Sequence, residues 1–100
     1  MLVVNRVVKK EIINEIKGID FSNRAWMDIA GEITDIDFTG SKFLNVNFTD
    51  VVNFTGCKFF NCDFTGSTNM MSKENFLIQV GLENVNAETL WIDGTSILLP

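Results

Sequence analysis

A phenylalanine recurs at every fifth residue between residues 36 and 66, with one extra residue between the third copy and the fourth. The positions are Phe38, Phe43, Phe48, Phe54, Phe59 and Phe64. A spacing of five matches neither the 3.6-residue period of an amphipathic helix nor the two-residue alternation of a strand. The pattern therefore predicts a short structural unit repeated along an axis, in which each copy sends the same side chain into a shared core.

Each five-residue unit has the same internal order, as in Ile36-Asp37-Phe38-Thr39-Gly40. The first place is small or β-branched, the second is polar, the third is Phe, and the last two favour Thr-Gly, Leu-Asn or Thr-Asp. Gly and Asn suit a sharp corner, and β-branched or aromatic residues suit a short extended stretch. We expect the first and third places to point inward and the second to point outward.

These units resemble those of the pentapeptide-repeat family, in which a small residue and Asp or Asn precede Leu or Phe. The resemblance implies an all-β solenoid, a right-handed quadrilateral parallel β-helix of about four coils. The repeat phase covers a β-helix at residues 19–99, and the apolar spacing of the preceding residues indicates an N-terminal cap of a strand and a short helix at residues 1–18. A loop insertion is expected near residues 70–79, where the five-residue phase is lost.

Two segments outside the main array allow more than one interpretation. The cap is either a basic arm that binds a partner or, as we favour, a cover for the open end of the solenoid. Met70 and Met71 lie in a segment that is either an adaptable binding surface or a loop folded back on its own wall, and Ser72 is suited to start a helical turn. Weaker units beginning at Val80 place Leu82 inward and Trp91 outward, where the preceding loop is expected to cover Trp91.

Nothing in the sequence indicates an enzyme, a cofactor or a metal site. The chain has no histidine, the commonest general base and metal ligand. Cys57 and Cys62 both fall at the inward first place, and two thiols supply only half of a zinc site. A disulfide stays open, but buried reduced thiols agree better with a cytoplasmic chain. No apolar run is long enough to span a membrane.

Charge is the surface feature with functional content. Residues 19–99 hold eleven acids and four bases, a net charge of −7, and residues 1–18 contribute +2. An acidic wall argues against direct nucleic-acid binding, which requires Lys and Arg. In a coil of 21 residues that extrudes Val51, Asp37 stacks on Lys58 and Lys42 on Asp63, so these charges neutralise one another. The acids left free form a candidate binding surface: Glu32, Asp35, Asp50, Glu83, Glu88 and Asp93.

Two classes of function remain open. The first is a non-enzymatic scaffold whose acidic walls bind a basic protein partner. The second comes from the resemblance, since some pentapeptide-repeat proteins are DNA mimics that inhibit or protect DNA-handling enzymes such as DNA gyrase. Four coils at ~4.8 Å spacing would give a rod of roughly 19 Å. DNA of that length carries about eleven phosphates, which is more charge than this chain offers.

The carboxyl end is expected to self-associate. The last unit, Thr95-Ser96-Ile97-Leu98-Leu99, has only Pro100 after it. An uncovered solenoid end would leave Ile92 and Ile97 facing water. A two-fold homodimer would cover them, with Ile97, Leu98 and Leu99 at the contact, and the family resemblance implies the same.

Overall fold

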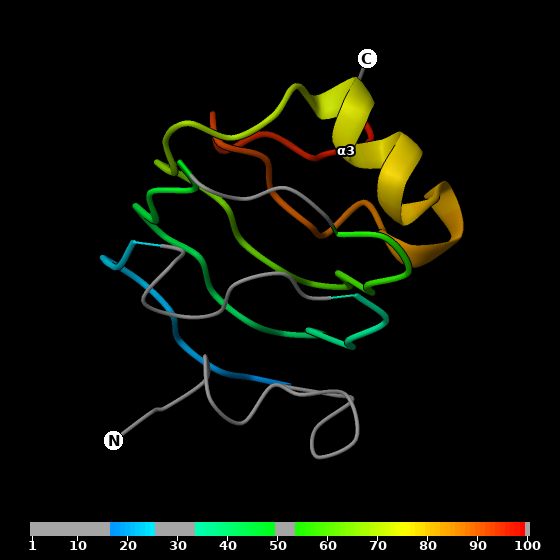
Figure 1. The fold of residues 1–100 in the computed structure, drawn as a ribbon, viewed down its shortest axis with the longest axis horizontal. Helices are drawn as coiled ribbons and strands as arrows, with labels where there is room; N and C mark the ends of the chain where they lie inside the picture. Colours follow the sequence, from blue (N-terminus) through cyan, green and yellow to red (C-terminus); the bar gives the residue numbers. More distant parts are fainter. Residues whose placement is uncertain (1–16, 26–33, 50–53, 100) are drawn as a thin grey trace.

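The computed structural model describes residues 17–25, 34–49 and 54–99. Figure 1 shows that the chain winds through stacked turns, which run from residues 17–25 at one end of the stack to the C-terminal segment at the other. Short extended stretches alternate with tight corners within each turn, as the five-residue units predict.

Adjacent turns are joined by isolated parallel β-bridges. Asp37 pairs with Lys58 and Lys42 pairs with Asp63, which confirms the predicted 21-residue register. The further parallel bridges join Asp20 to Lys42, Ala25 to Asn47, Asn47 to Thr68, Phe59 to Val85 and Asp63 to Leu90. Corners interrupt the backbone every five residues, so the paired stretches stay short and continuous strands are absent from the described residues. Val51, whose extrusion we expected, lies outside them.

The core is a stack of phenylalanine rings. All six repeat phenylalanines are at most 1% exposed, which confirms their inward orientation. Phe38 stacks on Phe59 with ring centroids 5.2 Å apart, and Phe43 stacks on Phe64 at 5.0 Å. The two rings of each stacked pair are 21 residues apart in sequence, as are the bridged residues. Phenylalanines at the same place in successive turns therefore stack along the axis. Cys57 and Cys62 are also buried, as expected for the first place.

The corners are built from residues that tolerate a positive φ. Asn45 has φ 57° and Gly66 has φ 80°, and each ends a five-residue unit. Before several corners the second-place residue accepts hydrogen bonds from the fourth: Thr39 donates its N–H to Asp37 Oδ1 over 3.0 Å. These local bonds satisfy backbone donors where the ladder is interrupted.

The segment expected to be a loop insertion contains a helix. Helix α3 spans Lys73–Val80, and a 3₁₀ turn, η1, spans Leu82–Asn84. Ser72 is the N-cap of α3, and its side chain accepts a hydrogen bond from the N–H of Asn75, which confirms the predicted start. Gly81 follows the helix with φ 88°. Both helical elements lie on one side of the stack, near the C-terminal end (Figure 1). Because they are helical, the described chain is not all-β.

The helix resets the five-residue phase, so the sequence-based assignment for residues 80–94 is wrong. Val85, paired with Phe59, and Trp91 take the inward third place. Leu82 is 65% exposed, although the sequence placed it inward. Trp91 is 7% exposed and contacts Phe76 of α3, which confirms that the preceding segment covers it, although Trp91 holds an inward place and not the predicted outward one.

The phase changes because α3 and η1 lengthen this turn of the stack. The N–H of Cys62 donates to Thr89 Oγ1 in the next turn, and these two residues are 27 positions apart, whereas bridged residues of the repeats such as Asp37 and Lys58 are 21 apart.

Helix α3 replaces part of one wall. Phe38, Phe43, Phe48, Phe59 and Phe64 each donate their N–H to a backbone carbonyl of the next turn. The N–H of Phe54 instead donates to the side-chain Oε1 of Gln79 over 3.0 Å. Phe76 of α3 is fully buried, and its ring contacts those of Phe54 and Phe59. The helix therefore covers the core that a further coil would otherwise have covered.

Among the described residues, no helix has the length and hydropathy that crossing a membrane requires. The predicted cap at residues 1–18 lies outside the described part of the chain, apart from Lys17 and Gly18.

Candidate interaction surface

The outward charges of the repeat walls alternate in sign along the stack. Lys42 pairs with Asp20 on one side and with Asp63 on the other, and Asp37 pairs with Lys58. The third wall carries Ala25, Asn47 and Thr68, which are uncharged. These walls thus offer neighbouring charges of opposite sign rather than a row of carboxylates.

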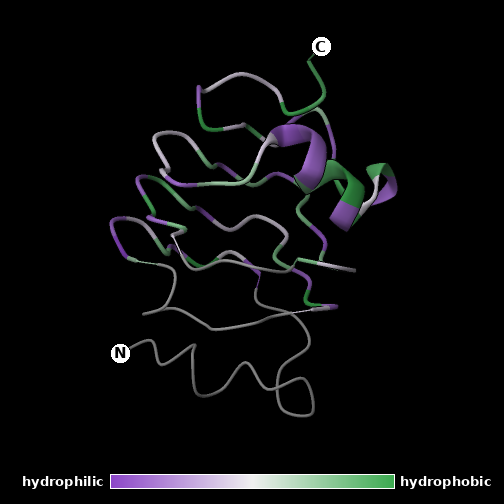
Figure 2. Cartoon of the chain, turned by 45° about the horizontal axis from the view of Figure 1, so that its top comes forward, coloured by the Kyte–Doolittle hydropathy of each residue, from purple (hydrophilic) through white to green (hydrophobic). Residues whose placement is uncertain are grey.

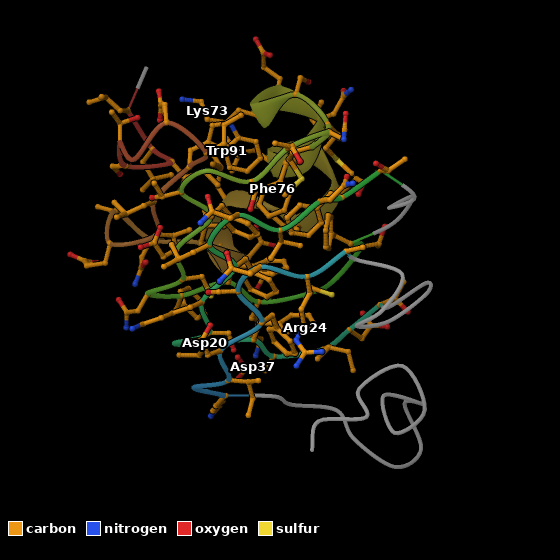
Figure 3. All side chains as sticks on the ribbon, turned by 90° about the vertical axis from the view of Figure 1, so that its left-hand side faces the viewer. Asp20, Arg24, Asp37, Lys73, Phe76 and Trp91 are labelled. Atoms are coloured by element: carbon orange, nitrogen blue, oxygen red, sulfur yellow. The ribbon has the colours of Figure 1, made fainter. Side chains whose placement is uncertain are left out.

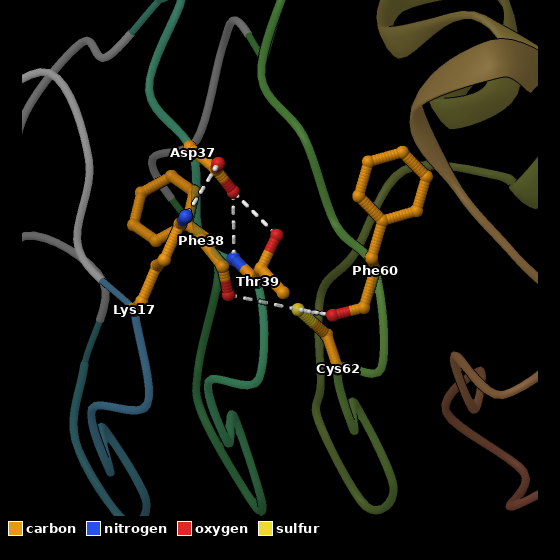
Figure 4. A network of polar contacts seen from close by, with 6 residues as sticks. All are labelled: Lys17, Asp37, Phe38, Thr39, Phe60 and Cys62. Atoms are coloured by element: carbon orange, nitrogen blue, oxygen red, sulfur yellow. Dashed lines mark hydrogen bonds and ion pairs between the residues drawn. The ribbon is translucent and has the colours of Figure 1, made fainter.

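Asp37 shows how firmly such a carboxylate is held (Figure 4). Its Oδ1 accepts hydrogen bonds from the N–H and the hydroxyl of Thr39, and its Oδ2 lies 3.7 Å from Lys17 Nζ. Desolvation raises the pKa of Asp37, but the hydrogen bonds from Thr39 and the charges of Lys17 and Lys58 outweigh it and leave the pKa below its usual value. This carboxylate is a structural group.

The six acids predicted to form a binding surface are not all placed. Glu32 and Asp50 lie outside the described residues, whereas Asp35, Glu83, Glu88 and Asp93 are exposed. Asp93 accepts hydrogen bonds from the hydroxyl and the N–H of Thr95, and these bonds lower its pKa. Asp35 occupies a corner with φ 60° and packs against Gly56. Glu83, Glu88 and Asp93 belong to the last turn of the stack, and Asp35 lies on an earlier turn.

A different surface stands out on α3 and η1. Ile78 is 78% exposed and Leu82 is 65% exposed, the two highest values among the large apolar side chains described. Together with Leu77 and Glu74 they line an open groove of about 410 Å³. In Figure 2 this part of the chain stands at the side of the stacked turns, with hydrophobic residues along it.

The groove follows from the way in which α3 is attached. Phe76 and Val80 point into the core and are at most 2% exposed. The side chain of Gln79 accepts a hydrogen bond from the N–H of Phe54. Glu74 and Ile78 are four residues apart in α3, so they lie on one helical face, which points away from the core. Leu82 lies beyond the end of α3, at the start of η1, and lines the same groove. Figure 3 shows Phe76 and Trp91 inside the stack at this end.

The sequence left the segment near residues 70–79 open as a binding surface, but it missed the groove itself because it extended the five-residue phase to Leu82 and placed that side chain inward. The available signal was the pair of helix boundaries, Ser72 before the segment and Gly81 after it. Between them the apolar residues do not recur at intervals of five.

Comparison with protein families agrees with the repeat register described above. The family model for pentapeptide repeats matches residues 33–67, with 8 copies. This segment consists of pentapeptide repeats. The comparison confirms the resemblance over the part of the chain where the phenylalanines recur. No curated protein and no solved structure gives a significant match to the chain.

The C-terminal segment beyond the pentapeptide repeats differs from the expected uncovered end. Ile97 is fully buried and belongs to the core, so its predicted exposure is wrong. The chain folds back, with an antiparallel bridge between Leu90 and Ser96, and this places Ile97 inside. Leu98 and Leu99 are 43% and 51% exposed. Lys73 Nζ donates to the carbonyl of Leu99 over 2.6 Å, which ties this segment to the start of α3.

The two cysteines of the pentapeptide repeats are buried and are not joined in a disulfide. Cys62 Sγ donates to the carbonyl of Phe38 over 3.1 Å (Figure 4), and Ser67 Oγ makes the equivalent bond to Phe43. Desolvation raises the pKa of the Cys62 thiol to about 12, so it stays protonated at neutral pH. Within the described ranges, no group of three metal-ligating side chains comes together.

Proposed function

We propose that this protein is a non-enzymatic protein-binding scaffold, whose pentapeptide-repeat core holds α3 and η1 outward as the contact surface. The observation that carries the proposal is the pair Ile78 and Leu82, which are both exposed and line one groove, while the inner face of α3 is buried in the core. An exposed apolar cluster with a polar rim is typical of a protein contact. The acidic walls contribute less to partner binding than the sequence suggested, because neighbouring turns place acidic and basic residues side by side.

DNA mimicry receives less support as an alternative. A mimic of the duplex needs carboxylates that follow one another along an axis with the density of phosphates. The pairs Asp20–Lys42, Lys42–Asp63 and Asp37–Lys58 instead place a base beside each acid. An inhibitor of DNA gyrase built on these walls would present both signs of charge to a basic surface.

We also infer that the repeats wind as a right-handed quadrilateral β-helix, the fold that pentapeptide repeats generally form. The parallel bridges and their 21-residue register support this inference. Two buried cysteines that are not joined in a disulfide favour a reducing compartment such as the cytoplasm. A homodimer through the C-terminal segment stays a prediction, with its contact now limited to Leu98 and Leu99.

Photo-cross-linking from two positions tests the proposed function. A photoreactive amino acid replaces Ile78 in one version of the full chain and Lys42, on a repeat wall, in the other. In extracts of the native host, we expect one set of proteins to cross-link from position 78 and to be absent from position 42. Cross-links from the wall alone would contradict the proposal. Inhibition of gyrase supercoiling, lost on substitution of wall acids, would favour mimicry instead.

A further inference from the structure

We propose that the α3–η1 groove binds a short partner segment in which aliphatic side chains are flanked by Lys or Arg. The inference rests on the proposed function and specifies the chemistry of the partner. It draws on the shape of the groove, the charges around it and the rigidity of the helix that forms it.

The floor of the groove is aliphatic. Leu77 is partly buried and packs against the core, so it closes the groove from below. Ile78, near the end of α3, and Leu82, at the start of η1, are both exposed and both line the groove, so one partner helix or extended segment can contact both. Burial of these side chains supplies the apolar part of the binding free energy.

The charges at the rim are acidic. Glu74 lines the groove, and Glu83 is exposed next to Leu82. The bases on the adjoining elements are engaged elsewhere. Lys58 lies beside Asp37, whose pKa its charge lowers. Lys73 donates to the carbonyl of Leu99 and its charge lowers the pKa of Asp93. A cationic flank on the partner therefore complements this rim.

The same charges disfavour a second copy of the chain as the occupant. A two-fold contact places identical patches against each other. Glu74 and Glu83 of one copy would approach the same acids of the other, and the groove lining contains no base to compensate them. Like charges brought together at a contact cost affinity.

The groove is also preformed. Phe76 contacts the rings of Phe64 and Trp91, and Val80 is 2% exposed, so the inner face of α3 is fixed in the core. Little ordering is then needed when a partner binds, which preserves more of the contact energy. For the same reason, substitutions at the outer face are expected to leave the fold intact.

Two fluorescein-labelled peptides test the inference by anisotropy with the full chain. Both have the same amphipathic leucine pattern, and one carries Lys where the other carries Glu. We expect the Leu–Lys peptide to bind at least tenfold more tightly than the Leu–Glu peptide. The double variant Ile78→Ser/Leu82→Ser should weaken Leu–Lys binding at least tenfold, whereas Leu98→Ser/Leu99→Ser, also exposed, should not.

A charge-matched pair separates the groove from general attraction to an acidic protein. Glu74→Lys and Glu88→Lys change the net charge equally, and both sites are exposed. Only Glu74→Lys should weaken Leu–Lys binding more than threefold and strengthen Leu–Glu binding. Equal effects of the two variants would overturn the inference, and so would Leu–Lys binding that survives Ile78→Ser/Leu82→Ser. Circular dichroism melting checks that each variant folds.

The outcomes also separate this inference from the proposed function. If both peptides bind equally and Ile78→Ser/Leu82→Ser removes both, the partner is not cationic and the inference fails, while the scaffold function stands. Failure of both peptides to bind likewise overturns the inference. Self-association in sedimentation that Ile78→Ser/Leu82→Ser abolishes would identify a second copy as the occupant and contradict the inference. The scaffold function depends instead on partner cross-linking from position 78.

Discussion

Trp91 lies against Phe64, with ring centroids 5.7 Å apart, at the place in its turn that a phenylalanine holds in the pentapeptide units. Phe43 stacks on Phe64 from the other side at 5.0 Å, so one aromatic column runs from the repeats into the C-terminal part of the chain. Phe76 of α3 touches both Phe64 and Trp91. The core therefore continues beyond the recognisable repeats, although the five-residue phase does not.

Replacement of Trp91 tests this continuity. Trp91→Ala should lower the free energy of unfolding by about 3–5 kcal/mol, because it removes a buried aromatic side chain. Trp91→Phe restores the residue found in the repeats and should cost less than half as much. Urea unfolding followed by circular dichroism measures both. Similar small losses for the two variants would mean that Trp91 is not part of the core.

Phe59 lies at the centre of the aromatic cluster, within 6.1 Å of the rings of Phe38, Phe43, Phe54, Phe64 and Phe76. Phe59→Ala should cost about 3–5 kcal/mol, enough to threaten a domain of this size. The matched control is Leu82→Ala, at a residue 65% exposed, which should stay within about 0.5 kcal/mol. Equal losses in urea unfolding would contradict the assignment of core and surface.

Gln79 tests the junction between α3 and the repeats. Gln79→Met keeps the length of the side chain but removes the acceptor for the N–H of Phe54. Loss of a partner for this part-buried donor should cost about 1–3 kcal/mol. Gln79→Glu, which keeps an acceptor oxygen, should cost less, and the N–H of Phe54 should exchange faster with deuterium only in Gln79→Met. Unchanged exchange there would show that this bond does not protect the wall.

How far the sequence predicts this structure depends on whether a segment repeats. The burial of the repeat phenylalanines follows from the five-residue phase. The pairing of Asp37 with Lys58 follows from the same phase once the family resemblance supplies four units for each coil. The positions of Leu82, Trp91 and Ile97 do not, because α3 consumes residues without obeying that phase. Helix boundaries at Ser72 and Gly81 can be read locally, but the number of residues they remove from the coil is set by packing against Phe54 and Phe59.

The candidate site was predictable only in part, for a related reason. Stacking of Asp37 on Lys58 was foreseen, and it correctly removed those charges from the list of free acids. The helix boundaries at Ser72 and Gly81 indicate the segment that carries the apolar groove, but an aliphatic residue such as Ile78 gives no sign in the sequence of whether it faces the core or water. Only the fixed inner face, Phe76 and Val80, decides which side of α3 remains outside.

Asp37 should contribute stability that depends on acid pH. Its pKa is lowered in the folded chain, so its contribution is present above the unfolded value near 3.9 and is lost as pH falls through the folded value. Asp37→Asn keeps the acceptor for Thr39, as Asn47 does for Thr49, and removes only the charge. We expect a cost below about 1 kcal/mol at pH 7 and a gap that closes below about pH 4. Urea midpoints across this range measure it; a constant gap would contradict the assignment.

Cys62 should make the folded chain sensitive to alkaline pH. Desolvation raises the pKa of its thiol from 9.0 to about 12 in the folded chain, so the thiol is neutral in both states below pH 9 and costs nothing there. As pH rises from 9 toward 12, only the unfolded chain releases the proton, and stability falls by up to about 1.4 kcal/mol per pH unit.

Cys62→Ser does not titrate, and Ser67 shows that a serine makes the same bond to the carbonyl beneath it. The variant should therefore lose less stability than the wild type between pH 9 and 11, with Cys57 and the lysines common to both. A thiol reagent at pH 8 should modify Cys62 only after urea is added, and rapid modification of the native chain, or identical pH slopes for the two proteins, would show that the thiol is not buried as described.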